Sequence, residues 1–151
     1  MKRNRSLFVL AIVALGGVAL AAQQKPNFSG RWVAVSPAEA AGQEQFVKHD
    51  ATSLSTSHEA EGDPHRAVYK LDGTESRNVI TSHGEDIVTT SKATWSGAQL
   101  TITSVTTYAD GRRRDLKEVW SLDAEGRLVM EINLTMAGQP PMAIKMVSVK
   151  K

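Results

Sequence analysis

The sequence predicts an all-β protein, an antiparallel up-and-down meander of about ten strands. The first indication is a regular series of turn signals between residues 72 and 141, spaced 11 to 15 residues apart. This spacing accommodates one strand and one turn, and the intervening residues are rich in Thr, Val, Ile and aromatic side chains, which favour strands. The turn signals are Asp72-Gly73, Gly84, Gly97, Asp110-Gly111, Glu125-Gly126 and Gly138-Gln139-Pro140-Pro141.

The second indication is a period of two within these segments. Along 128–136 the even positions are all apolar, whereas the odd positions include Glu131, Asn133 and Thr135. Residues 98–108 alternate in a similar way, with Leu100 and Ile102 on the even face. Such alternation is typical of an antiparallel sheet with one face in the core and one face in water.

Each strand follows from these signals, and one short helix is expected after the first strand. There, Ser36 is a candidate cap, Pro37 suits the first helical position, Glu39 completes a capping box and Gly42 ends the turn. The helix is at most two turns long. The predicted strands are 28–35, 45–49, 52–56, 65–71, 75–82, 86–96, 98–108, 112–123, 127–136 and 142–149.

Short connections make a meander the simplest topology for these strands. An open meander exposes two unpaired edges, and closure into a barrel removes them. We therefore favour a closed barrel over an open sheet or a sandwich. A barrel of about ten strands is wide enough to leave a ligand cavity at its centre.

The N-terminus has the features of a cleavable signal peptide. Lys2, Arg3 and Arg5 precede an uncharged apolar run over 7–20, and Ala19-Leu20-Ala21 provides a cleavage site. The run has 14 residues, whereas a membrane-spanning helix needs about 20, so cleavage is favoured over a retained membrane anchor. The prediction is a signal peptide over 1–21, no stable membrane anchor after cleavage, and a periplasmic or secreted protein.

The remaining residues 22–151 are predicted to form a single β-barrel domain. They carry 15 basic and 16 acidic side chains, so the basic character of the whole chain belongs to the targeting segment. This charge balance gives no support for nucleic-acid binding. The chain has no cysteine, so the domain is stabilised without disulfides. For the same reason, a lipid anchor on an N-terminal cysteine is excluded. The sequence leaves the oligomeric state open.

The first strand opens with Asn27-Phe28-Ser29-Gly30-Arg31-Trp32. This segment resembles the opening strand of fatty-acid-binding proteins and the Gly-x-Trp element of lipocalins. It also resembles small exported bacterial proteins that begin Asn-Phe-Ser-Gly-x-Trp, and that likeness extends to 69–73 and to hairpins starting at Trp95 and Trp120. The resemblance implies a lipocalin-like (calycin) barrel in which Trp32 closes one end, Gly30 permits a close approach of chains and Trp95 is structural.

Two features of those families are missing from this sequence. Fatty-acid-binding proteins have a lid of two helices, and this chain has room for a stub only. They also hold a carboxylate with an Arg-x-Tyr pair in the last strand, and residues 142–149 contain no such pair. The resemblance therefore implies the fold without implying a fatty-acid ligand.

The candidate ligand-binding residues lie on the predicted inner face. The four methionines after residue 21 are Met130, Met136, Met142 and Met146, all of even parity in the last two strands, where Leu134 and Ile144 share their face. Methionine suits a pocket for varied apolar ligands, although ordinary core filling explains the same pattern and a copper(I) site is a further alternative.

Glu118 and Trp120 are predicted on the same inner face, in the preceding strand. A carboxylate there would orient a polar ligand group, or would sit at a β-bulge or pair with Arg77 or Arg114.

Two polar clusters have simpler interpretations. Residues 58–65 gather two histidines and three carboxylates that could bind a metal, but a solvated loop explains them, and no metal site is predicted. Strand alternation should split the triplet over 112–114 between two faces.

No catalytic motif and no cofactor site stand out in the sequence, and an enzyme is the less favoured interpretation. The sequence favours an exported binding protein for a small hydrophobic or amphipathic molecule. The alternative is a ligand-free structural or interaction domain of the cell envelope.

Overall fold

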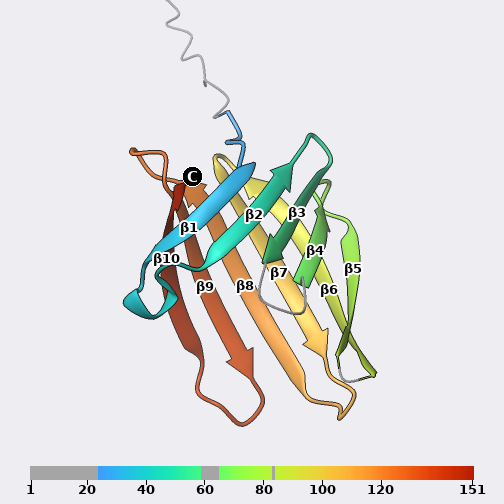
Figure 1. Cartoon of the computed structure of the whole chain (residues 1–151). Helices are drawn as coiled ribbons and strands as arrows, with labels where there is room; N and C mark the ends of the chain where they lie inside the picture. The colour runs from blue at the N-terminus through green and yellow to red at the C-terminus, as the bar shows by residue number, and fades with distance from the viewer. Residues whose placement is uncertain (1–23, 59–64, 83) are drawn as a thin grey trace, which may run out of the picture.

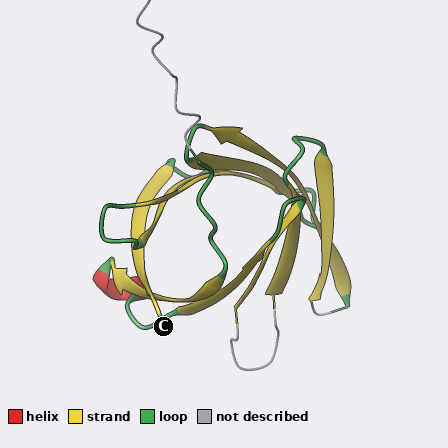
Figure 2. Cartoon of the chain, turned by 90° about the horizontal axis from the view of Figure 1, so that it is seen from above, coloured by secondary structure: helices red, strands yellow, loops and turns green. Residues whose placement is uncertain are grey.

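The computed structural model describes residues 24–58, 65–82 and 84–151, and the side chains of His65 and Ser82 are not described. Ten antiparallel strands form one sheet that curls into a nearly closed barrel (Figures 1 and 2). The predicted all-β meander is confirmed. The strands are β1 Gly30–Ser36, β2 Glu44–His49, β3 Ser53–His58, β4 His65–Lys70, β5 Glu75–Ser82, β6 Glu85–Ser96, β7 Gln99–Thr107, β8 Arg113–Leu122, β9 Leu128–Met136 and β10 Met142–Lys150.

The strand order is β4-β3-β2-β1-β10-β9-β8-β7-β6-β5, so each strand pairs with a neighbour in the chain except where the two ends of the chain meet. There β1 pairs with β10, with Trp32 opposite Lys150 and Ala34 opposite Ser148. This pairing joins the two halves of the meander. The strands β1 to β4 are short, whereas β6 to β9 extend further toward the lower end of the barrel (Figure 1).

The barrel closes between β4 and β5 through side chains. These strands are the two edges of the sheet and have no backbone ladder between them. Instead, the Asn78 side chain accepts a hydrogen bond from the Val68 backbone N–H (2.9 Å) and donates one to the Val68 carbonyl (3.1 Å). The Lys70 N–H donates to Ser76 Oγ (2.7 Å). These bonds satisfy edge groups that would otherwise be open to another strand.

The helix after β1 is a single 3-10 turn, Ala38–Ala40. The predicted capping box is wrong. Ser36 belongs to β1, where it pairs with Val147, and the residue at the N-terminal cap is Pro37, which forms no side-chain capping bond. Strand pairing with β10 therefore removes Ser36 from the cap position.

The upper end of the barrel is filled by the apolar core. Residues before β1 cross this opening (Figure 2), and Phe28 there is fully buried. The Phe28 ring packs against the rings of His49, Trp95 and Trp120 at centroid distances of 5.7 to 5.9 Å. The other core residues are Trp32, Val47, Leu54, Ala93, Leu100, Ile102, Leu128 and Met130.

The three predicted structural residues lie at this closed end. Trp32 is 1% exposed, as predicted, and its indole N–H donates to the Phe28 carbonyl (2.8 Å). Gly30 has φ +148°, a backbone conformation that L side chains rarely adopt, so glycine is favoured at this position. The Trp95 ring stacks on Phe28 and His49.

Two sequence predictions lie outside the described residues, namely the signal peptide over 1–21 and most of the polar loop, residues 59–64. Within the described ranges, no helix has the length and apolar character needed to cross a membrane.

Candidate ligand-binding site

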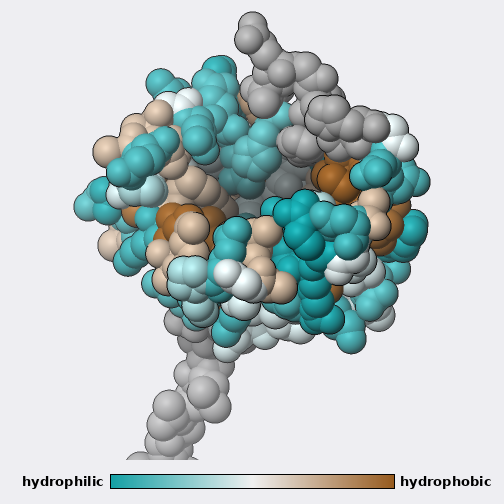
Figure 3. Space-filling view, turned by 90° about the horizontal axis from the view of Figure 1, so that it is seen from below, coloured by the Kyte–Doolittle hydropathy of each residue, from teal (hydrophilic) through white to brown (hydrophobic). Residues whose placement is uncertain are grey.

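A cavity of about 450 Å³ lies inside the lower half of the barrel. Its lining comes from the beginnings of β2, β4, β6 and β8 and from the ends of β3, β5 and β7, which meet at one end because neighbouring strands are antiparallel. Seen from below, the molecule is hollowed on this face (Figure 3). The apolar core fills the opposite end of the barrel.

The lining combines apolar and polar side chains. Ala67, Ile80, Ile87 and Leu116 provide apolar walls, and Trp120 lies where the cavity meets the core. Polar groups from several strands are interspersed among them. Their presence on the inner face departs from the usual pattern of a filled apolar interior.

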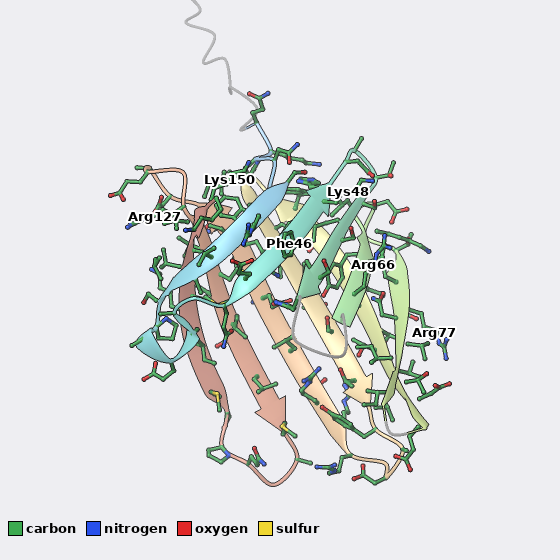
Figure 4. The ribbon with its side chains drawn as sticks, in the orientation of Figure 1. Phe46, Lys48, Arg66, Arg77, Arg127 and Lys150 are labelled. Atoms are coloured by element: carbon green, nitrogen blue, oxygen red, sulfur yellow. The ribbon has the colours of Figure 1, made fainter. Side chains whose placement is uncertain are left out.

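Strand β8 presents Arg114 and Glu118 to the cavity on the same face as Leu116 and Trp120. Alternation turns every second residue inward, and the pairing of β8 with β7 and with β9 continues through this region without a bulge. The bulge considered for Glu118 is therefore excluded. The ion pair with Arg77 is excluded as well, because Arg77 is exposed and points away from the barrel (Figure 4).

Burial raises the pKa of the Glu118 carboxyl to about 7, although the positive charge of Arg114 acts in the opposite direction. Among the described side chains, no cation forms an ion pair with the Glu118 carboxylate, and this includes the guanidinium of Arg114. The carboxyl group is thus divided between its neutral and ionised forms near neutral pH.

Three buried polar atoms of lining residues have no hydrogen-bond partner among the described residues. They are Arg114 Nε, Trp120 Nε1 and Gln45 Oε1. Buried donors and acceptors in folded proteins are nearly always paired, and an unpaired one costs about 1–3 kcal/mol. Two of the three atoms are donors and one is an acceptor, so a partner that both accepts and donates hydrogen bonds fits this cavity.

Tyr69 of β4 is a further polar residue that lines the cavity. Its hydroxyl bonds to the Thr56 side chain, and burial together with the nearby Glu118 carboxylate raises the pKa of Tyr69 well above its ordinary value. Tyr69 therefore keeps its proton throughout the physiological range. On the other side, Arg114 donates to Thr106 Oγ1 (3.2 Å), which in turn bonds to Thr89 Oγ1 (2.9 Å). These two hydrogen bonds orient the guanidinium of Arg114.

The structure brings together some of the predicted site residues and leaves others apart. Glu118 and Trp120 line the cavity. Met130 is 1% exposed in the core, Met146 packs against that core, and Met142 is 50% exposed. Met136, Leu134 and Ile144 are partly exposed on the same inner face of β9 and β10, beyond the residues that line the cavity. A ligand contact with the methionine face stays a prediction.

The sequence analysis missed Arg114, Tyr69 and Gln45 as site residues. Parity would have identified Arg114, because it shares the even face of β8 with Glu118. The triplet does split as predicted, since Arg112 pairs with Asp110 and Arg113 with Asp115, leaving Arg114 to turn inward. Tyr69 and Gln45 come from strands whose position opposite β8 depends on closure of the barrel.

No metal site is found among the residues that the structure describes, where no three histidine, aspartate or glutamate side chains are grouped suitably. The predicted polar loop lies largely outside those residues, so its interpretation stays a prediction.

The fold is a nearly closed, ten-stranded antiparallel β-barrel with a cavity in its lower half. No protein-family model matches the chain, and no curated protein matches it. Among solved structures, the chain is similar to the REP1-NXSQ fatty acid transporter, with 13% identity and a TM-score of 0.55 over 82% of this chain and 95% of the transporter.

A luciferase domain from the dinoflagellate Lingulodinium polyedrum is also similar, with 10% identity and a TM-score of 0.52 over 86% of this chain and 46% of that one. At these identities the comparisons establish a shared fold, in agreement with the lipocalin-like barrel expected from the sequence.

Proposed function

We propose that this protein binds a small amphipathic molecule in the lower cavity of the barrel. The observation that carries this proposal is a cavity of about 450 Å³, within the usual range of about 300–1,000 Å³ for ligand pockets, lined by both apolar walls and unpaired polar atoms. A purely structural barrel would gain stability by filling this space.

The fatty acid transporter supports the proposal because it has the same fold. In this chain β8 contributes Arg114 to the cavity and β4 contributes the exposed Arg66, whereas β10 contributes no lining residue. The polar end of the ligand is therefore expected beside Arg114 and Glu118, and its apolar part against Leu116, Ile80 and Ile87.

Filling the cavity should abolish binding. Ala67 lines the cavity on β4, so Ala67→Trp places an indole in the ligand space. We expect the neutral dye N-phenyl-1-naphthylamine to bind the wild type with saturation, detected by fluorescence enhancement, and to bind Ala67→Trp at least tenfold more weakly, which corresponds to about 1.4 kcal/mol.

The matched control is Ala143→Trp, which adds the same side chain at an exposed position of β10 and should leave dye binding unchanged. Both variants need unfolding curves, so that loss of binding is separated from loss of the fold. Absence of saturable binding in folded wild type would favour the structural alternative.

We also propose that the chain is exported, to the periplasm or beyond the cell, after removal of residues 1–21. The short apolar run and the Ala-x-Ala site carry this proposal. N-terminal sequencing of protein from the exported fraction should begin at Ala22 or within one residue of it. Exported protein that still begins at Met1 would contradict cleavage.

A further inference from the structure

We propose that the cavity takes up an anionic amphipathic molecule together with one proton, and that Glu118 is the group that accepts the proton. This inference rests on the proposed function and names the ligand class and the residue that makes binding depend on pH.

The geometry places the positive charge of Arg114 and the titratable carboxyl of Glu118 in the same cavity. Arg114 and Glu118 both project from β8 into the cavity. Arg114 Nε is buried and unpaired, so the guanidinium has a hydrogen bond to give to an acceptor in the cavity. Trp120 Nε1 is a second unpaired donor on the same strand. Donors without partners beside a cation favour an anionic ligand group.

Ionised Glu118 opposes such a ligand. A second negative charge in the same cavity raises the free energy of binding, because like charges repel and the partly buried Glu118 is weakly screened by solvent. Protonation of Glu118 removes this repulsion, and the anionic group of the ligand then interacts with the positive charge of Arg114. An anion and an ionised Glu118 therefore compete for the same cation, and binding of the anion favours the protonated carboxyl.

Several other charged or titratable side chains line the cavity besides Glu118. Tyr69 on β4 stays neutral, because burial raises the pKa of its hydroxyl. Arg114 supplies a guanidinium, and arginine side chains carry a fixed positive charge in proteins. The remaining ones are nearer the mouth, at the strand ends: Arg66 of β4, an exposed cation, His58 of β3, and Tyr108 after β7. His58 is the control position, because it lines the cavity from β3, a different strand from Glu118.

The test compares two dyes on the same scaffold. The first, 8-anilinonaphthalene-1-sulfonate, keeps its negative charge at every pH used, and the second, N-phenyl-1-naphthylamine, lacks the sulfonate. Because Glu118 titrates at about pH 7, the dissociation constant of the sulfonate dye should rise about tenfold between about pH 6 and about pH 8, whereas that of the neutral dye should stay constant.

Three variants test which residues cause the pH dependence of dye binding and the preference for the sulfonate dye. Glu118→Gln should bind the sulfonate dye as tightly at about pH 8 as at about pH 6, and His58→Gln should retain the wild-type pH dependence. Arg114→Gln should lose the preference for the sulfonate dye and keep the neutral one. The far-UV circular dichroism of each variant shows that the barrel is folded.

The outcomes separate this inference from the proposed function. Binding of the neutral dye alone, or sulfonate binding that does not change with pH, overturns the inference and leaves the cavity a binding site. A pH dependence that persists in Glu118→Gln also overturns it. Failure of both dyes to bind folded wild type contradicts the proposed function itself.

Discussion

Replacing Trp32 with Ala is expected to lower the free energy of unfolding by about 3–5 kcal/mol, the range for removing a large buried aromatic side chain. Trp32 is 1% exposed in the core at the closed end of the barrel. Its indole donates to the carbonyl of Phe28, and the Lys150 ammonium lies 5.6 Å from its ring centroid. The substitution therefore leaves a cavity, an unpaired carbonyl and a less firmly held N-terminal segment.

Urea unfolding followed by far-UV circular dichroism measures this change without relying on tryptophan fluorescence. Val35→Ala is the control, because Val35 lies on the same strand and is 48% exposed. Its effect should remain within about half a kcal/mol, as for most surface substitutions. A loss below about 1 kcal/mol for Trp32→Ala would mean that the closed end tolerates an empty site.

The second large effect is expected from Glu118→Gln, measured without ligand. The folded-state pKa of Glu118 is about 7, above its ordinary value of 4.5, so folding favours the neutral carboxyl. Ionisation is easier in the unfolded chain, and the wild type therefore loses stability as pH rises from about 4.5 to about 7. Above about pH 7 the penalty is complete, at about 3 kcal/mol for the shift between these two values.

The glutamine variant has no carboxyl to ionise, so this penalty is absent. Glu118→Gln should be more stable than the wild type at about pH 8, and the advantage should shrink by about 3 kcal/mol on lowering the pH to about 4.5. Comparing the two proteins at each pH cancels the contribution of other groups. One of these is His49, whose pKa is lowered by burial, so that it destabilises the fold as pH falls below about 6.5. An advantage independent of pH would contradict the raised pKa of Glu118.

The short helix shows where local signals mislead. Ser36, Pro37 and Glu39 form a plausible start for a helix when only neighbouring residues are considered. In the barrel, Ser36 continues β1 because it pairs with Val147, more than a hundred residues away in the chain. The 3-10 turn that follows has three residues, too few to compete with the strand ladder.

The sequence predicted some of the residues of the candidate site and missed others. Alternation along β8 placed Glu118 and Trp120 inside, and the same argument applies to Arg114, because the period of two is a local property of a strand. The methionine face was predicted correctly as an inner face at Met130 and Met146. Nothing local distinguishes an inner face that is packed solid from one that borders a cavity.

The sequence by itself determined the ten strands, the meander and the side of each strand that faces inward, since turn signals and alternation are encoded within a few residues. Only the tertiary structure decided which end of the barrel is filled. The segment before β1 crosses the upper opening (Figure 2), and its Phe28 is part of the buried core. The cavity is consequently left at the other end. Tyr69 and Gln45 line it together with Glu118 because β1 pairs with β10 and because side-chain hydrogen bonds between β4 and β5 close the barrel.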